Sequence, residues 1–537
     1  MALGDMLGSA KMNGMSGHSA IYGDRFTKVQ GARSSTQTGA KAQYYPTGPP
    51  ENETYNPTCP ATYDLTNLPH RSQTDYWIML CKIDTATSKR QIAAISRDTG
   101  VARIPLCVAS PAFLHPSYFP IDPFHLFYEN CMPFVWDTWT TGSKPRERVH
   151  IPADKIEALG ALVGVAYKTL PPVFCGTIRN PHLKRQSQYK AYKWMALLHW
   201  YILPMGLELE FDFSVLNNFS YFVEAVQTAM MIKSHSQNDL KALQGIINTF
   251  LETYEALYVG NDPTKILRCC LCVFQLVHVP IHISWYGSIR NGSQATVERE
   301  IGHAEHQIHL KTHPFANLEN IIVENEMVRL VQLYHPTLSP LWAKDRTFAS
   351  PLPSRLWKLS QALRINKVDV AGLADHFAAI RQCLGIRSSR SLMEYDLRRF
   401  GKLQMTKHTL RSRISEIQTS TTNKRAEIST HQFAEAIAFY SLSYLGQERT
   451  VAVYTPLEGV NSPLKTVIRG KWPSDATKIF AIETASVSNL VGIWEAKDSG
   501  NVYVLRKHPG LEMLDTSQCG LPHGLEKEAD DGETDDS

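Results

Sequence analysis

Residues 118–130 read YFPIDPFHLFYEN and place an aspartate and a histidine, Asp122 and His125, three residues apart among large apolar side chains. Burying a carboxylate among such neighbours is costly unless a hydrogen-bonding partner, a metal ion or a chemical role compensates it. The segment therefore predicts either a structural Asp–His link or part of a site. The residues alone favour the structural link, because most buried polar pairs in proteins are hydrogen-bonded for stability.

The chain has 537 residues, more than one hydrophobic core usually organises, which predicts two to four domains. Its most apolar run, ILRCCLCVFQLVHVPIHI (266–283), is interrupted by Arg268, His278 and Pro280 and so indicates a buried core element instead of a membrane span. The first twenty residues have no basic segment followed by an apolar one, so we expect no signal peptide. We expect no membrane partner and a reducing compartment.

Charge is distributed unevenly along the sequence. The chain carries a net +4, the tail 521–537 carries −6, and the rest therefore carries +10. Between Arg381 and Arg425 eleven basic residues stand against three acidic ones. A basic body suits a polyanionic partner, although a solvated helix face explains such a run equally well. The DNA-binding candidates in this region are Arg387, Arg390, Arg398, Arg399, Lys402, Lys407, Arg411 and Arg413.

Hydrophobic periodicity predicts an α+β protein that is mainly helical. Helical spacing marks residues 72–98, 153–169, 187–203, 205–234 and 238–259, whereas short β-rich runs with turn signals begin near residue 447. The predicted parts are a core element with a long loop (1–70), a helical region (71–335), a basic helical region (336–440), a small β module (441–515) and an acidic disordered tail (516–537).

The run GSQATVEREIGHAEHQIHLKTHP (292–314) combines Glu298 with His303, His306 and His309. Two interpretations compete, a solvated charged face and a zinc site. Because HExxH is absent and no cysteine lies in the run, the charged face is favoured. A hydrolase that uses His303 or His306 as general base has the least support, because no GxSxG nucleophile motif is present.

Several segments in one order carry a resemblance. They are LGDMLGSAKMNGMSGHS with Asp5, FPIDPFHLFYEN, FVWDTWTTG, KTLPPVFCGTIRNP, YKAYKWMALLHWYILP, WYGSIRNGSQATVEREIG and THPFANLEN. This series resembles the fungal branch of the CACTA (En/Spm-type) transposases, related to the Kyakuja-Dileera-Zisupton group, over residues 1–335. The resemblance implies a ribonuclease H-like catalytic domain with a large helical insertion, DNA as partner and a nuclear location.

The resemblance also implies roles for single residues. Members of the family hold two Mg²⁺ or Mn²⁺ ions with two aspartates and a glutamate, and the ions activate the attacking oxygen and stabilise the leaving one. Asp5 matches the second aspartate and Glu298 the glutamate, which makes both the implied catalytic and metal-binding residues. Asp122 and His125 match a D-x-x-H signature inside the insertion, and we interpret this pair as a structural brace near the site.

The sequence also departs from the family. The chain begins four residues before Asp5, so the first catalytic aspartate and the zinc modules of relatives are not in it. We expect a transposase-derived, truncated protein that is inactive in strand transfer, with a non-catalytic DNA- or chromatin-binding protein as the alternative. Expected partners are DNA, a full-length transposase or a second copy. We further expect residues 1–60 to be poorly ordered, and Trp194, Trp200, Phe222 and Tyr254 to pack the helical region.

Overall fold

The computed structural model describes residues 3–33, 43–48, 63–166, 170–171, 174, 178–184, 189, 191–295, 297–298, 313–335, 357–363, 372–405, 409–416, 425–428, 432–475 and 478–507. It is a mixed α/β structure, about 49% helix and 19% strand, and its sheets are antiparallel. The expected mixture of helix and sheet is therefore confirmed. No described helix is long and apolar enough to span a membrane. The chain forms two compact units, one of residues 1–294, 459–471 and 492–537 and one of residues 295–458 and 472–491.

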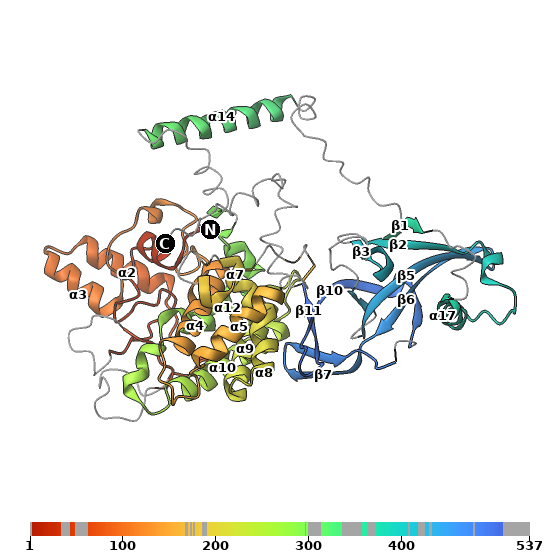
Figure 1. The fold of residues 1–537 in the computed structure, drawn as a ribbon. Helices are drawn as coiled ribbons and strands as arrows, with labels where there is room; N and C mark the ends of the chain where they lie inside the picture. Colours follow the sequence, from red (N-terminus) through yellow and green to blue (C-terminus); the bar gives the residue numbers. More distant parts are fainter. Residues whose placement is uncertain are drawn as a thin grey trace. The chain divides into compact units, whose positions relative to one another are not determined.

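The first unit is built mainly of helices (Figure 1). Its α-helices are α1 (Met6–Met12), α2 (Gln73–Asp84), α3 (Lys89–Thr99), α4 (Met132–Thr140), α5 (Ala153–Ala166), α6 (Pro181–Lys184), α7 (Ala191–Ala196), α8 (Ile202–Glu208), α9 (Phe213–Ala229), α10 (Gln237–Tyr258), α11 (Leu271–Phe274) and α12 (Val279–Tyr286). Its 3₁₀ and π segments are η1 (Leu106–Ala109), η2 (Phe124–Cys131), η4 (Leu197–Tyr201), η5 (Pro263–Arg268), η6 (Gln275–His278) and η7 (Ile289–Gly292).

The pair α9 and α10 shows how the sequence forms this unit. Asp212 caps the first turn of α9, and Ser236 with Asp239 forms a capping box at the start of α10, which satisfies amide groups that have no partner within the helix. The rings of Phe222 and Phe250 stack between the two helices at 5.4 Å. All four predicted packing residues, Trp194, Trp200, Phe222 and Tyr254, are buried, as expected.

The start of the chain is more ordered than expected. Phe26 and Val29 are fully buried, and Thr27 forms a bridge with His70. Poor order is therefore the wrong expectation for residues 3–33. The segment packs its apolar side chains into the helical core, where the Phe26 ring meets His278.

Three strands belong to the first unit, namely β7 (Glu458–Leu464, from its second residue), β8 (Val467–Lys471) and β11 (Val502–Arg506). Trp200 Nε1 donates to the carbonyl of Arg506 at 2.7 Å. The Glu208 carboxylate accepts from Ser499, Asn501 and Tyr503. These bonds attach the strands to the helices, so residues 441–515 do not form one separate β module.

The second unit is built around an antiparallel sheet. Its strands are β1 (Trp357–Leu363), β2 (Arg398–Met405), β3 (Thr409–Arg411), β4 (Arg425–Ile428), β5 (Gln432–Tyr444), β6 (Gln447–Pro456), β9 (Phe480–Glu483) and the first part of β10 (Val487–Glu495). Within this unit the order is β1-β2-β5-β4-β10, with β3 paired to β2 and β6 paired to β5 and β9. Its helical segments are α14 (Pro314–Tyr334), α17 (Ala374–Leu384), α18 (Arg413–Glu416), η9 (Leu392–Tyr395) and η10 (Thr484–Ser486).

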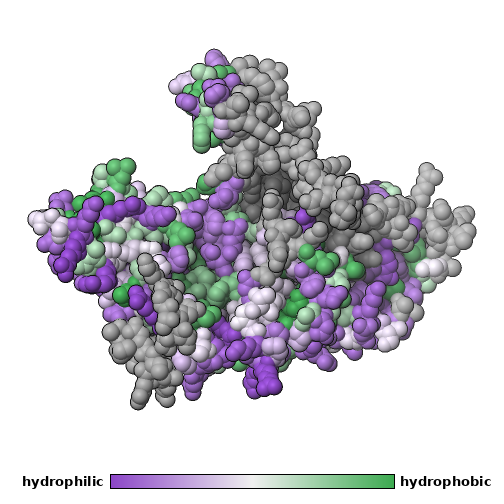
Figure 2. Space-filling view, turned by 60° about the vertical axis from the view of Figure 1, so that its left-hand side comes forward, coloured by the Kyte–Doolittle hydropathy of each residue, from purple (hydrophilic) through white to green (hydrophobic). Residues whose placement is uncertain are grey.

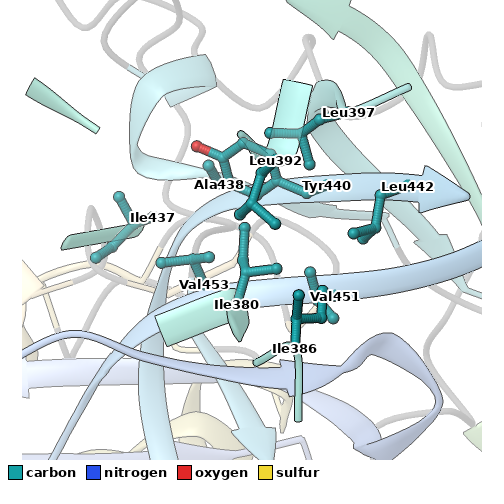
Figure 3. Close-up of a cluster of buried hydrophobic side chains, with 10 residues drawn as sticks. All are labelled: Ile380, Ile386, Leu392, Leu397, Ile437, Ala438, Tyr440, Leu442, Val451 and Val453. Atoms are coloured by element: carbon teal, nitrogen blue, oxygen red, sulfur yellow. The ribbon is translucent and has the colours of Figure 1, made fainter. Parts of the chain in front are cut away.

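Helix α17 packs on one face of this sheet and closes its core. Ile380 from the helix meets Tyr440 of β5 and Val451 and Val453 of β6 in one buried cluster (Figure 3). His376 of the same helix contacts the Tyr440 hydroxyl at 2.8 Å. The cluster therefore covers the face of β5 and β6 that carries Tyr440, Val451 and Val453.

The prediction of a helical region over residues 336–440 is wrong for most of its described part. Strands β1 to β4 and most of β5 fall in it, whereas α17, α18 and η9 are its described helical segments. The reason is visible in β5, QFAEAIAFYSLSY, which is buried along nearly all its length on both faces. A continuously apolar run loses the period-2 alternation and cannot be told from a buried helix by periodicity.

Candidate functional site

The structure brings Asp122 and His125 together. Asp122 is buried just before η2, and one of its carboxylate oxygens lies 2.5 Å from His125 Nδ1. The other oxygen accepts the backbone N–H of Phe124 at 2.9 Å and of Gln294 at 3.2 Å. The carboxylate thus binds the first residue of η2 and joins it to a segment 172 residues later.

Three further contacts hold the backbone of the same segment. The buried guanidinium of Arg25 donates to the carbonyls of Phe119 and Pro120 at 3.1 and 3.0 Å. The N–H of Ile121 donates to Nδ1 of His282 at 3.2 Å. Burial lowers the pKa of His282 well below its ordinary value, so this ring is neutral and its Nδ1 can accept. Each contact fixes main-chain groups, which is what a structural brace requires.

His125 is held on both sides. Its Nε2 lies 3.3 Å from a carboxylate oxygen of Glu129, one turn further along η2, and its side chain is 19% exposed. Ionised carboxylates only accept hydrogen bonds, so both ring nitrogens face acceptors. This arrangement orients the imidazole between Asp122 and Glu129.

A second buried cluster surrounds Asp24, which the sequence analysis did not single out. Asp24 is fully buried, and one carboxylate oxygen accepts from the Thr27 amide (2.8 Å), the Thr27 hydroxyl (2.6 Å) and His278 Nε2 (3.0 Å). Burial raises the pKa of Asp24, but the charge and hydrogen bond of His278 and the bonds from Thr27 outweigh it and lower the pKa to about 2. The carboxylate is therefore ionised and internally paired.

Aromatic contacts extend this cluster. The Phe26 ring lies edge-on between His278 and His282, with centroids 5.1 and 4.5 Å away, and Arg25 lies 4.5 Å above it. A signal for the cluster was present in the sequence, because His278 and His282 stand four residues apart inside an apolar run and buried imidazoles require polar partners. That partner could not be identified from the sequence because Asp24 lies 254 residues away.

The two implied metal ligands lie in different units. Asp5 belongs to the first unit, where its carboxylate is exposed and caps α1 by accepting the N–H of Gly8. Glu298 belongs to the second unit and is an exposed residue in a helical turn. Among the described residues, no group of three or more His, Cys, Asp or Glu side chains is arranged to hold a metal ion. His303, His306 and His309 lie outside the described residues.

The predicted DNA-binding residues fall on different parts of the second unit. Arg387 and Arg390 are exposed in the loop after α17. The guanidinium of Arg381 donates to the carbonyls of Ser388 and Arg390 and fixes this loop. Lys407 lies outside the described residues.

Two of the predicted residues are used within the unit. Arg399 lies opposite Tyr440 on β5, on the face covered by α17, and hydrogen-bonds to its side chain. Arg413 Nε pairs with the Glu435 carboxylate at 2.5 Å, and Glu435 is largely buried. Both cations therefore serve the packing of α17 and α18 against the sheet.

The remaining predicted DNA-binding residues lie on the face of the sheet opposite to the one that α17 covers. We call this surface the basic face. It is formed by Lys358, Arg398, Lys402 and Arg411. Lys402 lies directly opposite Arg411, and Lys358 lies opposite Gln404, two residues along β2. The buried pair Leu403 and Leu410 points to the other side, as the alternation of a strand requires. Arg398 pairs with the exposed Asp396.

Comparison with known proteins adds no assignment. No protein-family model matches the sequence, and no curated protein matches it significantly.

Proposed function

We propose that this chain is a transposase-derived protein that binds DNA through the basic face. The ordered motif series that includes FPIDPFHLFYEN and VEREIG supports descent from a transposase with a ribonuclease H-like domain. A nuclear location follows from the same descent. The contacts around Asp122 give that motif a role, because they join three distant segments of the first unit. The binding function is supported by the charges of the second unit.

The observation that carries the binding proposal is the pair Lys402 and Arg411. Like charges directly opposite on neighbouring strands destabilise a sheet. Both side chains are partly exposed on the basic face. A phosphate placed over the pair would accept charge-assisted hydrogen bonds from both side chains.

The spacing of the basic face fits an extended polyanion. Arg398 and Lys402 lie four residues apart on β2, about 13 Å along the strand, and Lys358 extends the row on β1. Duplex DNA carries one phosphate charge per roughly 1.7 Å of its axis, so several phosphates lie within the length of this row. Backbone contacts of this kind bind without reading sequence.

Strand cleavage is not part of the proposal. The Asp5 carboxylate is engaged at the start of α1, and Glu298 is an exposed residue in a helical turn. A two-metal site needs several carboxylates converging on one point, and the described residues do not fit such a centre.

Binding to a labelled DNA duplex, measured by fluorescence anisotropy, tests the proposal. The double variant Lys402→Glu/Arg411→Glu should bind at least about tenfold more weakly, because one charged hydrogen bond contributes about 1.5–3 kcal/mol. A matched control, Arg90→Glu/Lys241→Glu, reverses two exposed charges of the first unit and should bind like the wild type. Equal affinity of both variants would contradict the proposal.

A further inference from the structure

None of the 21 residues of helix α14 (Figure 1) is buried, and several of its exposed residues have large apolar side chains. Hydrophobic and hydrophilic residues lie side by side on the part of this helix that is visible at the top of Figure 2. The exposed apolar residues are Phe315, Ile322, Val323, Met327, Val328, Leu330, Val331, Leu333 and Tyr334. A helix of about 31 Å with so much apolar surface in water is not stable by itself, because most helical stability comes from packing. The helix therefore requires a partner surface.

Four of the exposed apolar residues of α14, namely Val323, Met327, Leu330 and Tyr334, follow a coiled-coil repeat. Residues 316, 320, 323, 327, 330 and 334 are separated by four, three, four, three and four positions. They are Ala, Asn, Val, Met, Leu and Tyr, and they form one continuous stripe, here called the seam. In heptad notation Val323 and Leu330 take position d, whereas Asn320, Met327 and Tyr334 take position a. The partner that fits such a seam is another helix with the same repeat.

Asn320 identifies the partner. An asparagine at position a is buried in the pair, and its amide is satisfied only by a polar group at the same level of the opposing helix. A second copy of α14, parallel and in register, places its own Asn320 there. We infer that α14 forms a parallel two-stranded coiled coil with α14 of a second copy of this chain.

The charges beside the seam oppose this pairing without preventing it. In a parallel pair, Glu319 at position g faces Glu324 of the second copy at position e. Such exposed like-charge pairs are weak, and burial of Val323, Met327, Leu330 and Tyr334 in two copies outweighs them several-fold. The repulsion limits the affinity, so the association should depend on protein concentration and on the charge at position 324.

Sedimentation equilibrium of the full chain over a concentration series tests the inference. The wild type should show a monomer–dimer equilibrium, and the seam variant Met327→Glu/Leu330→Glu should remain a monomer. The control Leu318→Glu/Ile322→Glu adds the same two charges on the opposite side of the helix and should still dimerise. A monomeric wild type, or a dimer that survives the seam variant, would overturn the inference.

Two further variants test the orientation. A symmetric dimer contains the repulsive contact between Glu319 and Glu324 twice. Glu324→Lys turns both contacts into attractive ones and should tighten the dimer roughly fivefold to tenfold. Asn320→Cys should yield a covalent dimer under mild oxidation, because only a parallel, in-register pair brings the two residues together, whereas Ile322→Cys should not. Weaker dimerisation of Glu324→Lys, or crosslinking through position 322 instead of 320, would contradict the parallel arrangement.

Discussion

His278 Nε2 lies 3.0 Å from a carboxylate oxygen of Asp24, and both side chains are shielded from solvent. The pair joins the start of the chain to the helical core near its most apolar segment. Breaking a buried ion pair by removing one partner costs about 3–5 kcal/mol. We expect Asp24→Asn to lower the free energy of unfolding by this amount at neutral pH, measured by urea denaturation, whereas the exposed variant Asp98→Asn should change it little.

The same pair predicts how stability depends on pH. The folded pKa of Asp24 is about 2, below the ordinary value of 3.8. A carboxyl with a lowered pKa stabilises the fold above the unfolded value, and this contribution is lost as the pH falls through the folded value. We expect a loss of roughly 2 kcal/mol between about pH 4 and pH 2. Asp24→Asn should remove that part of the pH dependence, and an unchanged acid profile would show that the pair is not formed.

Asp5 gives a prediction that separates a structural from a catalytic role. As the cap of α1, Asp5→Ser should keep most of the stability, whereas Asp5→Ala should lose about 1 kcal/mol. We also expect Mg²⁺ or Mn²⁺ to leave the melting temperature of the chain almost unchanged. A large rise with metal that disappears in Glu298→Ala would show that a metal site exists and that its exclusion from the proposal is wrong.

Gly292 and Gly164 should respond to alanine with opposite signs. A Cβ at Gly292 would lie 2.1 Å from the carbonyl oxygen of Ile121, which is backbone and is fixed by the contacts around Asp122. We expect Gly292→Ala to destabilise by about 1–3 kcal/mol, the usual cost of overpacking. Gly164 lies in α5 with open space around it, so Gly164→Ala should stabilise by roughly 0.5–1 kcal/mol. Thermal melts of the two variants test this prediction, since the melting temperature should fall for Gly292→Ala and rise for Gly164→Ala.

Local patterns allowed much of the first unit to be predicted. The spacing of apolar residues indicated the helices over 153–169 and 238–259, which lie at Ala153–Ala166 and Gln237–Tyr258. The three-residue spacing of Asp122 and His125 was enough to expect their contact, because both stand at the start of one helical segment. These predictions depend on neighbours in the sequence, for which periodicity and capping are informative.

The parts that could not be predicted depend on distant contacts. The link between Asp24 and His278 spans 254 residues, and neither residue shows its partner locally. The prediction of a helix where β5 lies was wrong for another reason. Both faces of this strand are covered, so its sequence lacks the alternation of apolar and polar residues that marks a strand. The basic residues likewise appeared as one cluster in sequence, whereas the strand alternation of β2 divides Arg399 from Lys402.

The salt dependence of DNA binding tests the central claim most directly. If the basic face contacts phosphates, log K for a duplex should fall linearly with log[salt], with a slope of about −0.9 per phosphate contacted. The variant Lys402→Ala/Arg411→Ala should reduce the steepness by about 2, and Arg90→Ala/Lys241→Ala should leave it unchanged. A flat slope for the wild type, or an identical slope in Lys402→Ala/Arg411→Ala, would contradict DNA binding through this face.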